Sequence, residues 1–399
     1  MANYKARLRP LLVIVFVPLV LLCLTGLTLA FSKSEIIHFD FRTQYAAGYM
    51  VRTGDGHRLY DYDENRRVQS EKVGPSELAL PFIHLAYEAL LYVPFSLLSY
   101  QSAYYSFLVI NFLVLIWCYH MLRPHLSSLV EVWVYLPAAI LGCFLPIIMA
   151  LVQGQSSILL LAIVILVSVR LDRGQDAWAG FFLGLSCTKF QYAVPIALLF
   201  LVWRRWRFVG GFAISAAFVA AISVCVTGIT GLMSYAHLLG SMSAHFSSQN
   251  GMSLGIRPEL MPNLRGLIYG MGGGASRTTN LITFILSIVV FLWAAIKPPS
   301  LPLALLTASL VSYHSTFTDA TLLILPITVG LATFLQNSTG TGPIAATCAI
   351  VFVAPAPLLL SGVRFHLLAV PIFCLFCLWD LVSPTIKTAY RIQDTHTAV

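Results

Sequence analysis

Charged residues are scarce in this sequence of 399 residues. Asp, Glu, Lys and Arg make up only 10% of the chain, whereas they make up about 25% of a typical soluble domain. This scarcity excludes an ordinary soluble protein, a disordered chain and a long coiled coil, because each of these classes needs more polar sequence. The residues AVILMFWYC account for 58%. Since a membrane-spanning helix needs roughly 20 mostly apolar residues, we predict a polytopic all-α membrane protein with at most about a dozen spans.

The sequence also lacks the motifs of several enzyme classes. It contains no G-x-S-x-G, no H-E-x-x-H and no nucleotide-binding fingerprint, so an ATP-driven or nucleotide-sugar enzyme is disfavoured. No spacing of His, Cys and carboxylates indicates a metal site, and we expect neither a metal nor another cofactor. All eight cysteines lie in apolar segments, so no disulfide framework is predicted. No basic run is interleaved with aromatic residues in a polar segment, and no nucleic-acid partner is expected.

The basic residues indicate how the chain crosses the membrane. Lys5, Arg7 and Arg9 precede an apolar run, Leu11–Phe31, which is longer than the roughly 7–15-residue core of a signal peptide. An uncleaved first helix with a cytoplasmic N-terminus is therefore predicted. Lys and Arg also gather in short loops between later apolar runs, which the positive-inside rule places in the cytoplasm. We expect a multi-pass protein of the cell membrane with both termini in the cytoplasm.

Apolar runs recur along the rest of the chain, at 101–121, 131–151, 156–170, 178–188, 192–203, 208–228, 280–296, 300–316, 320–335, 343–361 and 365–382. The runs 178–188 and 192–203 are each too short to cross a hydrocarbon core of about 30 Å. They predict a hairpin with Lys189 near its tip. Counting this hairpin as two helices, we expect about 10–12 transmembrane helices.

Two longer stretches, residues 32–100 and 229–279, are predicted to be non-cytoplasmic loops of a single integral membrane domain, 1–399. Within the first, Leu80–Leu98 is amphipathic and is interrupted by two prolines, which favours an interfacial helix over a span. Long outward loops on a protein of many membrane helices suggest that the protein acts on lipid-borne substrates at the outer leaflet.

Asp40 is the first candidate for chemistry, because it lies between two aromatic residues where the first helix leaves the membrane. Partial desolvation there would raise the pKa of a carboxyl group toward the range of a general base, while Arg42 would oppose that shift. The alternative is a carboxylate at a helix end that faces water or pairs with Arg42.

Two cations are further candidates. Lys189 lies in a short apolar segment, where a charge is costly unless it faces a cavity or a partner, and contact with a lipid phosphate would explain it. The alternative is a side chain that extends to the membrane interface. Arg265, in the second outward stretch, is able to bind phosphate through charge-assisted hydrogen bonds.

His314 and Asp319 flank a predicted outward turn between two late apolar runs. They are placed to line the same cavity as Asp40. The motif is equally compatible with a plain turn in which Asp319 caps the following helix.

Several blocks, in order along the chain, resemble glycosyltransferase family 87, which comprises polytopic polyprenol-phosphate-mannose-dependent α-1,2-mannosyltransferases of the C-type glycosyltransferase fold. The matching blocks are Asp40-Phe41-x-x-x-Tyr45-x-Ala47-Gly48, Gly56-x-x-Leu59-Tyr60-Asp61, Gln153-Gly154-Gln155-Ser156-Ser157, Ala179-Gly180-x-x-Leu183-Gly184-Leu185-x-x-x-Lys189, Asn263-Leu264-Arg265-Gly266 and Asp319-x-x-Leu322-Leu323-x-Leu325-Pro326. The chain has Pro81-Phe82-Ile83-His84 where the family more often has Tyr-Pro-Pro. Each block alone is weak, but the ordered set is specific to the family.

The resemblance implies a C-type glycosyltransferase-like helical bundle that makes or extends glycolipids. It implies an inverting transfer of a sugar, with mannose expected, from a polyprenyl-phosphate donor to a lipid-linked or glycan acceptor on the non-cytoplasmic (periplasmic or extracellular) face. Asp40 matches the family's first-loop aspartate, expected to be the general base. We expect Arg42, Tyr45, Lys189, Arg265, His314 and Asp319 to bind substrate. The alternatives are a flippase or transporter of a lipid-linked sugar and a non-catalytic membrane subunit of a glycan-assembly complex.

Overall fold

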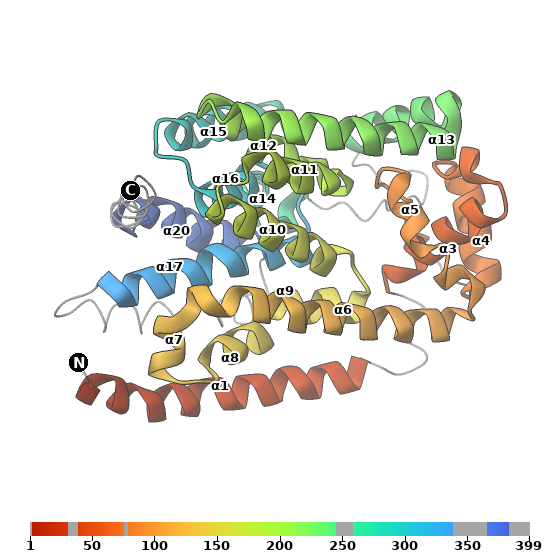
Figure 1. The fold of residues 1–399 in the computed structure, drawn as a ribbon. Coiled ribbons are helices and arrows are strands. Elements are labelled where there is room, and N and C mark those ends of the chain that lie inside the picture. The colour runs from red at the N-terminus through yellow and green to blue at the C-terminus, as the bar shows by residue number, and fades with distance from the viewer. Residues whose placement is uncertain (1, 31–38, 76–78, 245–257, 338–364, 383–399) are drawn as a thin grey trace. The chain divides into compact units, whose positions relative to one another are not determined.

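The computed structural model describes residues 2–30, 39–75, 79–244, 258–337 and 365–382 (Figure 1). Every regular element in these ranges is an α-helix or a 3-10 helix, which confirms the predicted all-α fold. The predicted span at 343–361 lies outside the described residues.

The chain divides into two compact units, each assembled from early and late parts of the sequence. Unit 1 comprises Met1–Thr25, Cys118–Ile148 and Glu259–Val399, and unit 2 comprises Gly26–Trp117 and Met149–Pro258. Because α1 (Ala2–Ala30), α6 (Tyr100–Leu122), α9 (Leu145–Gln153) and η5 (Pro258–Leu260) cross from one unit to the other, the units interleave along the sequence.

The remaining described elements of unit 2 are α3 (Phe41–Arg52), η1 (Gly56–Arg58), α4 (Tyr62–Lys72), α5 (Tyr87–Tyr92), η2 (Phe95–Leu97), α10 (Ser157–Asp172), α11 (Asp176–Leu185), η4 (Cys187–Lys189), α12 (Phe190–Val202) and α13 (Trp206–Ala244). Those of unit 1 are η3 (Arg123–Leu126), α7 (Ser127–Val132), α8 (Leu136–Cys143), α14 (Leu264–Met271), α15 (Arg277–Ala295), α16 (Leu301–Val311), η6 (Phe317–Leu323), α17 (Ile324–Asn337), η7 (Phe365–Leu368) and α20 (Ala369–Val382).

Several helices are long and apolar enough to cross a membrane. Among the described residues these are Tyr100–Val132, Trp206–Gly240 and Arg277–Ala295, and the number rises to 5 if each of two bent helix pairs is one span. On α15, Phe284 and Leu292 are largely exposed, as expected for side chains that face lipid. The polytopic class is therefore confirmed, and the count of ten to twelve stays a prediction.

Both bent pairs depart from the sequence prediction. The apolar run 131–151 is broken between α8 and α9, which meet at 55°. Pro146 lies in the first turn of α9, and without an N–H group it cannot continue the preceding helix. The predicted hairpin around Lys189 is also bent, with a change of direction of 62° between α11 and the segment Cys187–Val202. The two short helices therefore do not run antiparallel.

The second predicted outward stretch begins with helix rather than loop. Helix α13 extends to Ala244, with a kink at Gly228, which is the last residue of the apolar run 208–228. Gly228 has a φ of 70° and a ψ of 177°, a conformation that glycine adopts without steric cost. The kink thus coincides with the predicted end of the apolar run 208–228, and the chain is helical again after it.

Helices α11 and α13 pack with their backbones in contact. A Cβ atom on Gly184 would lie 2.8 Å from the carbonyl oxygen of Phe212, and one on Gly211 would lie 2.9 Å from the backbone nitrogen of Phe181. Gly180 and Gly184 form a G-x-x-x-G spacing, which permits close approach of helices in membranes. This contact fixes α11, and with it the segment that carries Lys189.

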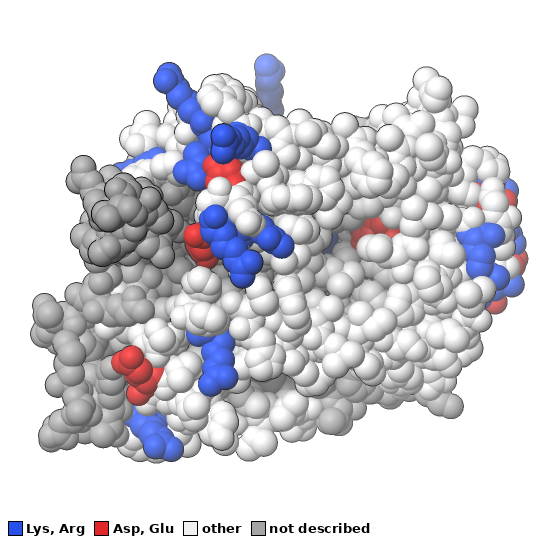
Figure 2. Space-filling model, viewed as in Figure 1, with Lys and Arg blue, Asp and Glu red and all other residues white. Residues whose placement is uncertain are grey.

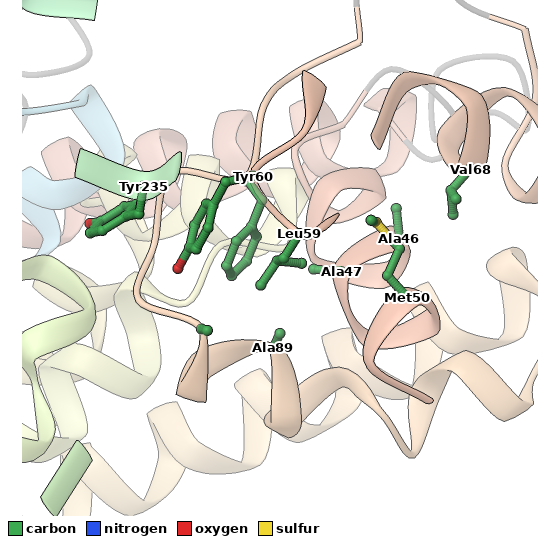
Figure 3. Packing of buried hydrophobic residues seen from close by; sticks show 10 residues of the cluster. Ala46, Ala47, Met50, Leu59, Tyr60, Val68, Ala89 and Tyr235 are labelled. Atoms are coloured by element: carbon green, nitrogen blue, oxygen red, sulfur yellow. The ribbon is translucent and has the colours of Figure 1, made fainter. Parts of the chain in front are cut away.

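An apolar cluster packs the described part of residues 39–100 together with α13 (Figure 3). It is formed by Ala46, Ala47, Met50, Leu59, Tyr60, Val68, Phe82, Ala86, Ala89 and Tyr235. The rings of Tyr60 and Tyr235 lie side by side, with centroids 4.7 Å apart. Their hydroxyl groups donate to the carbonyl oxygens of His84 and Ile83, at 2.9 Å and 3.2 Å respectively. The second half of α13 therefore anchors the segment before α5.

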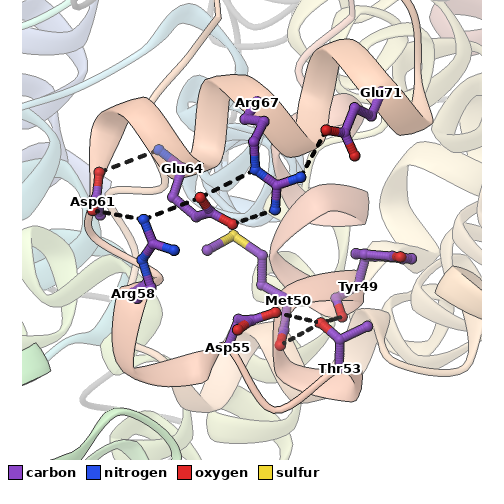
Figure 4. A network of polar contacts seen from close by, with 9 residues as sticks. All are labelled: Tyr49, Met50, Thr53, Asp55, Arg58, Asp61, Glu64, Arg67 and Glu71. Atoms are coloured by element: carbon purple, nitrogen blue, oxygen red, sulfur yellow. Dashed lines mark hydrogen bonds and ion pairs between the residues drawn. The ribbon is translucent and has the colours of Figure 1, made fainter.

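The polar face of the same loop lies on α4. Glu64 pairs with Arg58 at 3.1 Å, and Arg67 pairs with both Glu64 and Glu71 (Figure 4). Charge gathers over α4 in the space-filling view, whereas the surface over most of α13 carries none (Figure 2). Segment Leu80–Leu98, predicted as one interfacial helix, contains only the six-residue α5 and the turn η2.

Candidate active site

Asp40 occupies the N-cap position of α3. The next residue, Phe41, is fully buried and stacks on Phe107 of α6 with ring centroids 5.1 Å apart. One turn further on, the hydroxyl of Tyr45 donates to the carbonyl oxygen of Leu98 at 2.8 Å. Aromatic packing on α6 and a hydrogen bond to the end of the loop thus fix the start of α3, and Asp40 with it.

Two glutamine amides hold the carboxylate of Asp40. The Nε2 atom of Gln155 donates to its Oδ2. The amide of Gln153, with its nitrogen turned toward the carboxylate, donates to Oδ2 at 3.0 Å and to Oδ1 at 3.3 Å. Both partners are donors, which suits an ionised carboxylate, since that form only accepts hydrogen bonds.

Gly154, between these glutamines, has a physical reason to be glycine. Its φ is +62°, in the left-handed region that other residues rarely adopt. A Cβ atom here would also lie 2.7 Å from the Cβ of Phe41. The absence of a side chain therefore lets the turn 153–157 lie directly against α3, within reach of Asp40.

Lys189 contacts the turn that carries the two glutamines, through Ser157. Its Nζ donates to the hydroxyl of Ser157 at 3.3 Å. Only 4% of Lys189 is exposed, so the side chain is buried in protein rather than extended to the surface. The residues 153–157 thus contact both a carboxylate and an ammonium group.

Arg42 contacts the segment that follows α4. It is almost completely buried and donates to the carbonyl oxygen of Gly74 at 3.3 Å. Burial lowers the pKa of Arg42, against a smaller opposing effect from Tyr100. Arg42 thus ties the start of α3 to the end of the α4 segment.

Sequence reasoning missed two ionisable residues of unit 2. Glu88 of α5 is completely buried, and its Oε2 lies 2.7 Å from Nδ1 of His84. Burial, the largest influence, works to raise the pKa of Glu88. The pairing with His84, with help from Ser156 and Lys189, outweighs burial and holds that pKa below its ordinary value. The i, i+4 spacing of His84 and Glu88 in an apolar segment was the available signal.

Arg265 of unit 1 is packed between two aromatic rings. Its guanidinium carbon lies 4.1 Å from the ring centroid of Tyr313 and 5.2 Å from that of Tyr269. Its NH1 atom donates to the carbonyl oxygen of Tyr313 at 3.0 Å. The preceding Asn263 caps α14 by accepting from the backbone nitrogen of Gly266 at 2.8 Å. Arg265 therefore sits at the start of a helix whose cap is formed by its own motif.

Asp319 takes part in a helix cap. Its Oδ2 accepts from the backbone nitrogen of Thr316 at 2.9 Å, and Thr316 completes a capping box at the start of η6. This is a contact of the capping kind that the sequence allowed as an alternative. His314 lies in the turn before it and is half-buried.

The structure brings the predicted site residues together in two sets. Asp40, Arg42, Tyr45 and Lys189 belong to unit 2, and Arg265, His314 and Asp319 belong to unit 1. The cavity predicted to join the two sets stays a prediction. Within the described part of the chain, no group of three or more His, Cys, Asp and Glu residues is arranged to hold a metal ion.

The comparisons with known proteins gave one match. The sequence model of glycosyltransferase family 87 matches residues 87–326, which is more than half of the chain. This range includes Lys189, Arg265, His314 and Asp319, whereas Asp40 and its neighbours on α3 precede it. No curated protein matches, and no solved structure matches.

Proposed function

The chain belongs to glycosyltransferase family 87 and is a membrane glycosyltransferase, and we propose that it transfers mannose from a polyprenyl phosphate to a lipid-linked or glycan acceptor on the non-cytoplasmic face. One observation carries this proposal. Five consecutive residues, 153–157, hold the Asp40 carboxylate on one side and the Lys189 ammonium on the other. A base and a cation that contact the same turn suit transfer from a phosphate-linked sugar.

In the proposed reaction, the acceptor hydroxyl gives its proton to Asp40 as its oxygen bonds to the anomeric carbon of the donor. The bond from that carbon to the phosphate oxygen breaks on the opposite face of the sugar, which inverts the configuration. Its electron pair stays on the phosphate, which gains one negative charge. Lys189 balances that charge. The turn 153–157, which contacts both residues, holds the base and the cation in place relative to each other.

Among the three candidate cations, the contacts favour Lys189. Arg42 is bound to a backbone carbonyl of its own loop, and Arg265 is bound to the carbonyl of Tyr313 in unit 1. Lys189 instead has a hydroxyl partner, which a phosphate oxygen is able to replace. Tyr45 of unit 2 is proposed to contact substrate beside this pair, and the apolar helices are proposed to receive the polyprenyl tail. Substrate contacts of His314 and Asp319 in unit 1 stay predictions.

The test uses the full-length protein in liposomes with polyprenyl-phosphate-mannose and a lipid acceptor, and it measures the mannosylated product. We expect Asp40→Asn to lower the rate by about 10²–10⁴-fold, the range of a general base. Asp63→Asn is the matched control, because Asp63 is exposed on α4.

Three outcomes contradict the proposal. Undiminished transfer by Asp40→Asn removes Asp40 from the mechanism. Movement of the donor across the bilayer without transfer identifies a flippase. Transfer that appears only when another protein is added identifies a non-catalytic subunit.

A further inference from the structure

Two exposed cations, Arg52 and Lys72, share one aromatic ring at the end of α3 opposite to Asp40. Arg52 is the last residue of α3 and Lys72 is the last residue of α4. The guanidinium carbon of Arg52 lies 5.0 Å from the ring centroid of Tyr49, and Nζ of Lys72 lies 4.9 Å from the same centroid. These contacts keep two like charges near each other at the surface, an arrangement that suits an anionic ligand. We call Arg52 and Lys72 the basic pair.

No carboxylate of the described residues forms an ion pair with either member of the basic pair. The acidic residues that come next along the chain have other partners (Figure 4). Asp55 accepts a hydrogen bond from the hydroxyl of Thr53 at 3.0 Å, and Glu71 pairs with Arg67 at 2.7 Å. The positive charge of the basic pair is therefore left for a ligand from outside the chain.

Arg52 is tied to the segment that leads into a candidate membrane span. Its Nε donates to the hydroxyl of Ser96 in η2 at 3.0 Å. The next two residues, Leu97 and Leu98, are 69% and 43% exposed, and the apolar helix Tyr100–Val132 begins directly after them. Exposed leucines at the start of a span suit the boundary between lipid head groups and acyl chains. The hydrogen bond to Ser96 thus places Arg52 near the head groups.

Helix α5 adds to the same apolar edge. Leu90 and Leu91 are exposed, and the residue that follows them, Tyr92, packs directly on α3. A Cβ atom on Gly48 of α3 would lie 2.5 Å from the backbone carbonyl carbon of Tyr92, so the two helices are in backbone contact. The leucines of α5 and η2 and the basic pair therefore belong to one packed assembly of α3, α4, α5 and η2.

We propose that the basic pair binds the phosphate of an anionic phospholipid, while the leucines of α5 and η2 contact the upper part of its acyl chains. Guanidinium and ammonium groups form charge-assisted hydrogen bonds with phosphate oxygens, and anionic head groups attract basic residues near a membrane surface. The lipid is recruited from the leaflet that residues 32–100 face, which is predicted to be the non-cytoplasmic one.

This phospholipid is a different ligand from the sugar donor of the proposed reaction. Helix α3 has 12 residues, so Asp40 and Arg52 are separated by about 18 Å along its axis. The phosphate of the donor is bonded to the carbon that reacts beside Asp40, and it cannot also reach Arg52. The lipid site therefore stands whether or not Asp40 is the general base.

The test is native mass spectrometry of the full-length protein in detergent, titrated with phosphatidylglycerol or with phosphatidylcholine. We expect Arg52→Gln and Lys72→Gln each to weaken the binding of phosphatidylglycerol by about fivefold and the binding of phosphatidylcholine by much less. Leu97→Gln should weaken the binding of both lipids. Arg66→Gln is the matched control, because it removes the same charge from another exposed position of α4, and it should change neither affinity.

The thermal midpoint of each variant shows whether it is folded. Arg52→Lys separates charge from structure, since it loses the Nε contact with Ser96 but should keep most of the affinity for phosphatidylglycerol. Three results overturn the proposal. The first is unchanged binding of phosphatidylglycerol when both cations are replaced. The second is an equal loss from Arg66→Gln, which indicates general attraction by positive charge. The third is complete displacement of the lipid by inorganic phosphate, which indicates a site for small anions.

Discussion

Asp40 and Lys189 of unit 2 have other kinds of hydrogen-bond partner than Arg265 and Asp319 of unit 1. In unit 2, Asp40 and Lys189 contact amide and hydroxyl side chains. In unit 1, Arg265 donates to a backbone carbonyl and Asp319 accepts from a backbone N–H group. Backbone partners belong to the fold and side-chain partners are able to rotate, so a substrate displaces the second kind at lower cost. We therefore predict that the chemistry takes place at Asp40 and Lys189 and that these contacts of Arg265 and Asp319 are mainly structural.

Replacing a side-chain partner of Asp40 should have the largest effect. Gln155→Leu removes one of two donors to the carboxylate, and we expect kcat to fall by about 10- to 100-fold because the base loses its orientation. Gln175→Leu, at the N-cap of α11, is the control, since the hydrogen bond described for the Gln175 side chain is to Arg170, far along the chain from the turn 153–157. Equal rates for the two variants would show that the amide does not orient Asp40.

Gly154→Ala should act on the same contact through the backbone. We expect the free energy of unfolding to fall by about 1–3 kcal/mol from the left-handed φ, with a further loss from the contact with Phe41, and transfer to fall by about tenfold. Gly174→Ala is the matched control, because Gly174 has a φ of +68° but open space around it. It should show the backbone cost and normal transfer, and equal behaviour of the two variants would refute the close-approach argument.

Asp319→Asn tests whether the contact of Asp319 in unit 1 is mainly structural. The Asn side-chain oxygen is still able to accept from Thr316, so we expect a loss of stability below about 1 kcal/mol and nearly unchanged transfer. Both are measured by denaturant unfolding and by the transfer assay. A loss of transfer as large as that of Asp40→Asn would give Asp319 a direct role and would abolish the contrast between the units.

The smallest effect is expected on α4. Arg67, through its hydrogen bond, holds the pKa of Glu64 below its ordinary value, so the pair stabilises the folded state at neutral pH and the contribution is lost as pH falls through the lowered pKa. Because the Arg67 side chain is 52% exposed, water screens the pair although Glu64 itself is buried, and Glu64→Gln should shift the thermal midpoint at pH 7 by no more than about 2 °C. The shift should vanish in acid, and a larger shift at low pH than at pH 7 would contradict this sign.

The sequence predicted the fold class, whereas it did not predict which residues contact one another across the chain. Low charge and long apolar runs are local properties, and they were sufficient for the all-α membrane class. The block Gln153–Ser157 was recognised, but its contact with Asp40 joins residues 115 positions apart, which no periodicity reveals. Glu88 was missed because an isolated carboxylate in an amphipathic segment is expected to face water.

The bend between α11 and α12 also could not be predicted from the sequence. Apolar runs interrupted near Lys189 predicted two short helices, and both are present as α11 and α12. Their angle depends on how α11 packs on α13 through Gly180 and Gly184, a long-range contact. The hairpin prediction was wrong for that reason, although the elements themselves were correct.

The turn 153–157 has a consequence for how this chain tolerates change in length. Three contacts, from Gln153 and Gln155 to Asp40 and from Ser157 to Lys189, arise within five consecutive residues. A substitution removes one contact, but the insertion or deletion of a single residue shifts the register of all three at once. Length variation among related chains should therefore be absent from this turn and frequent around α4, where the ion pairs lie at the surface.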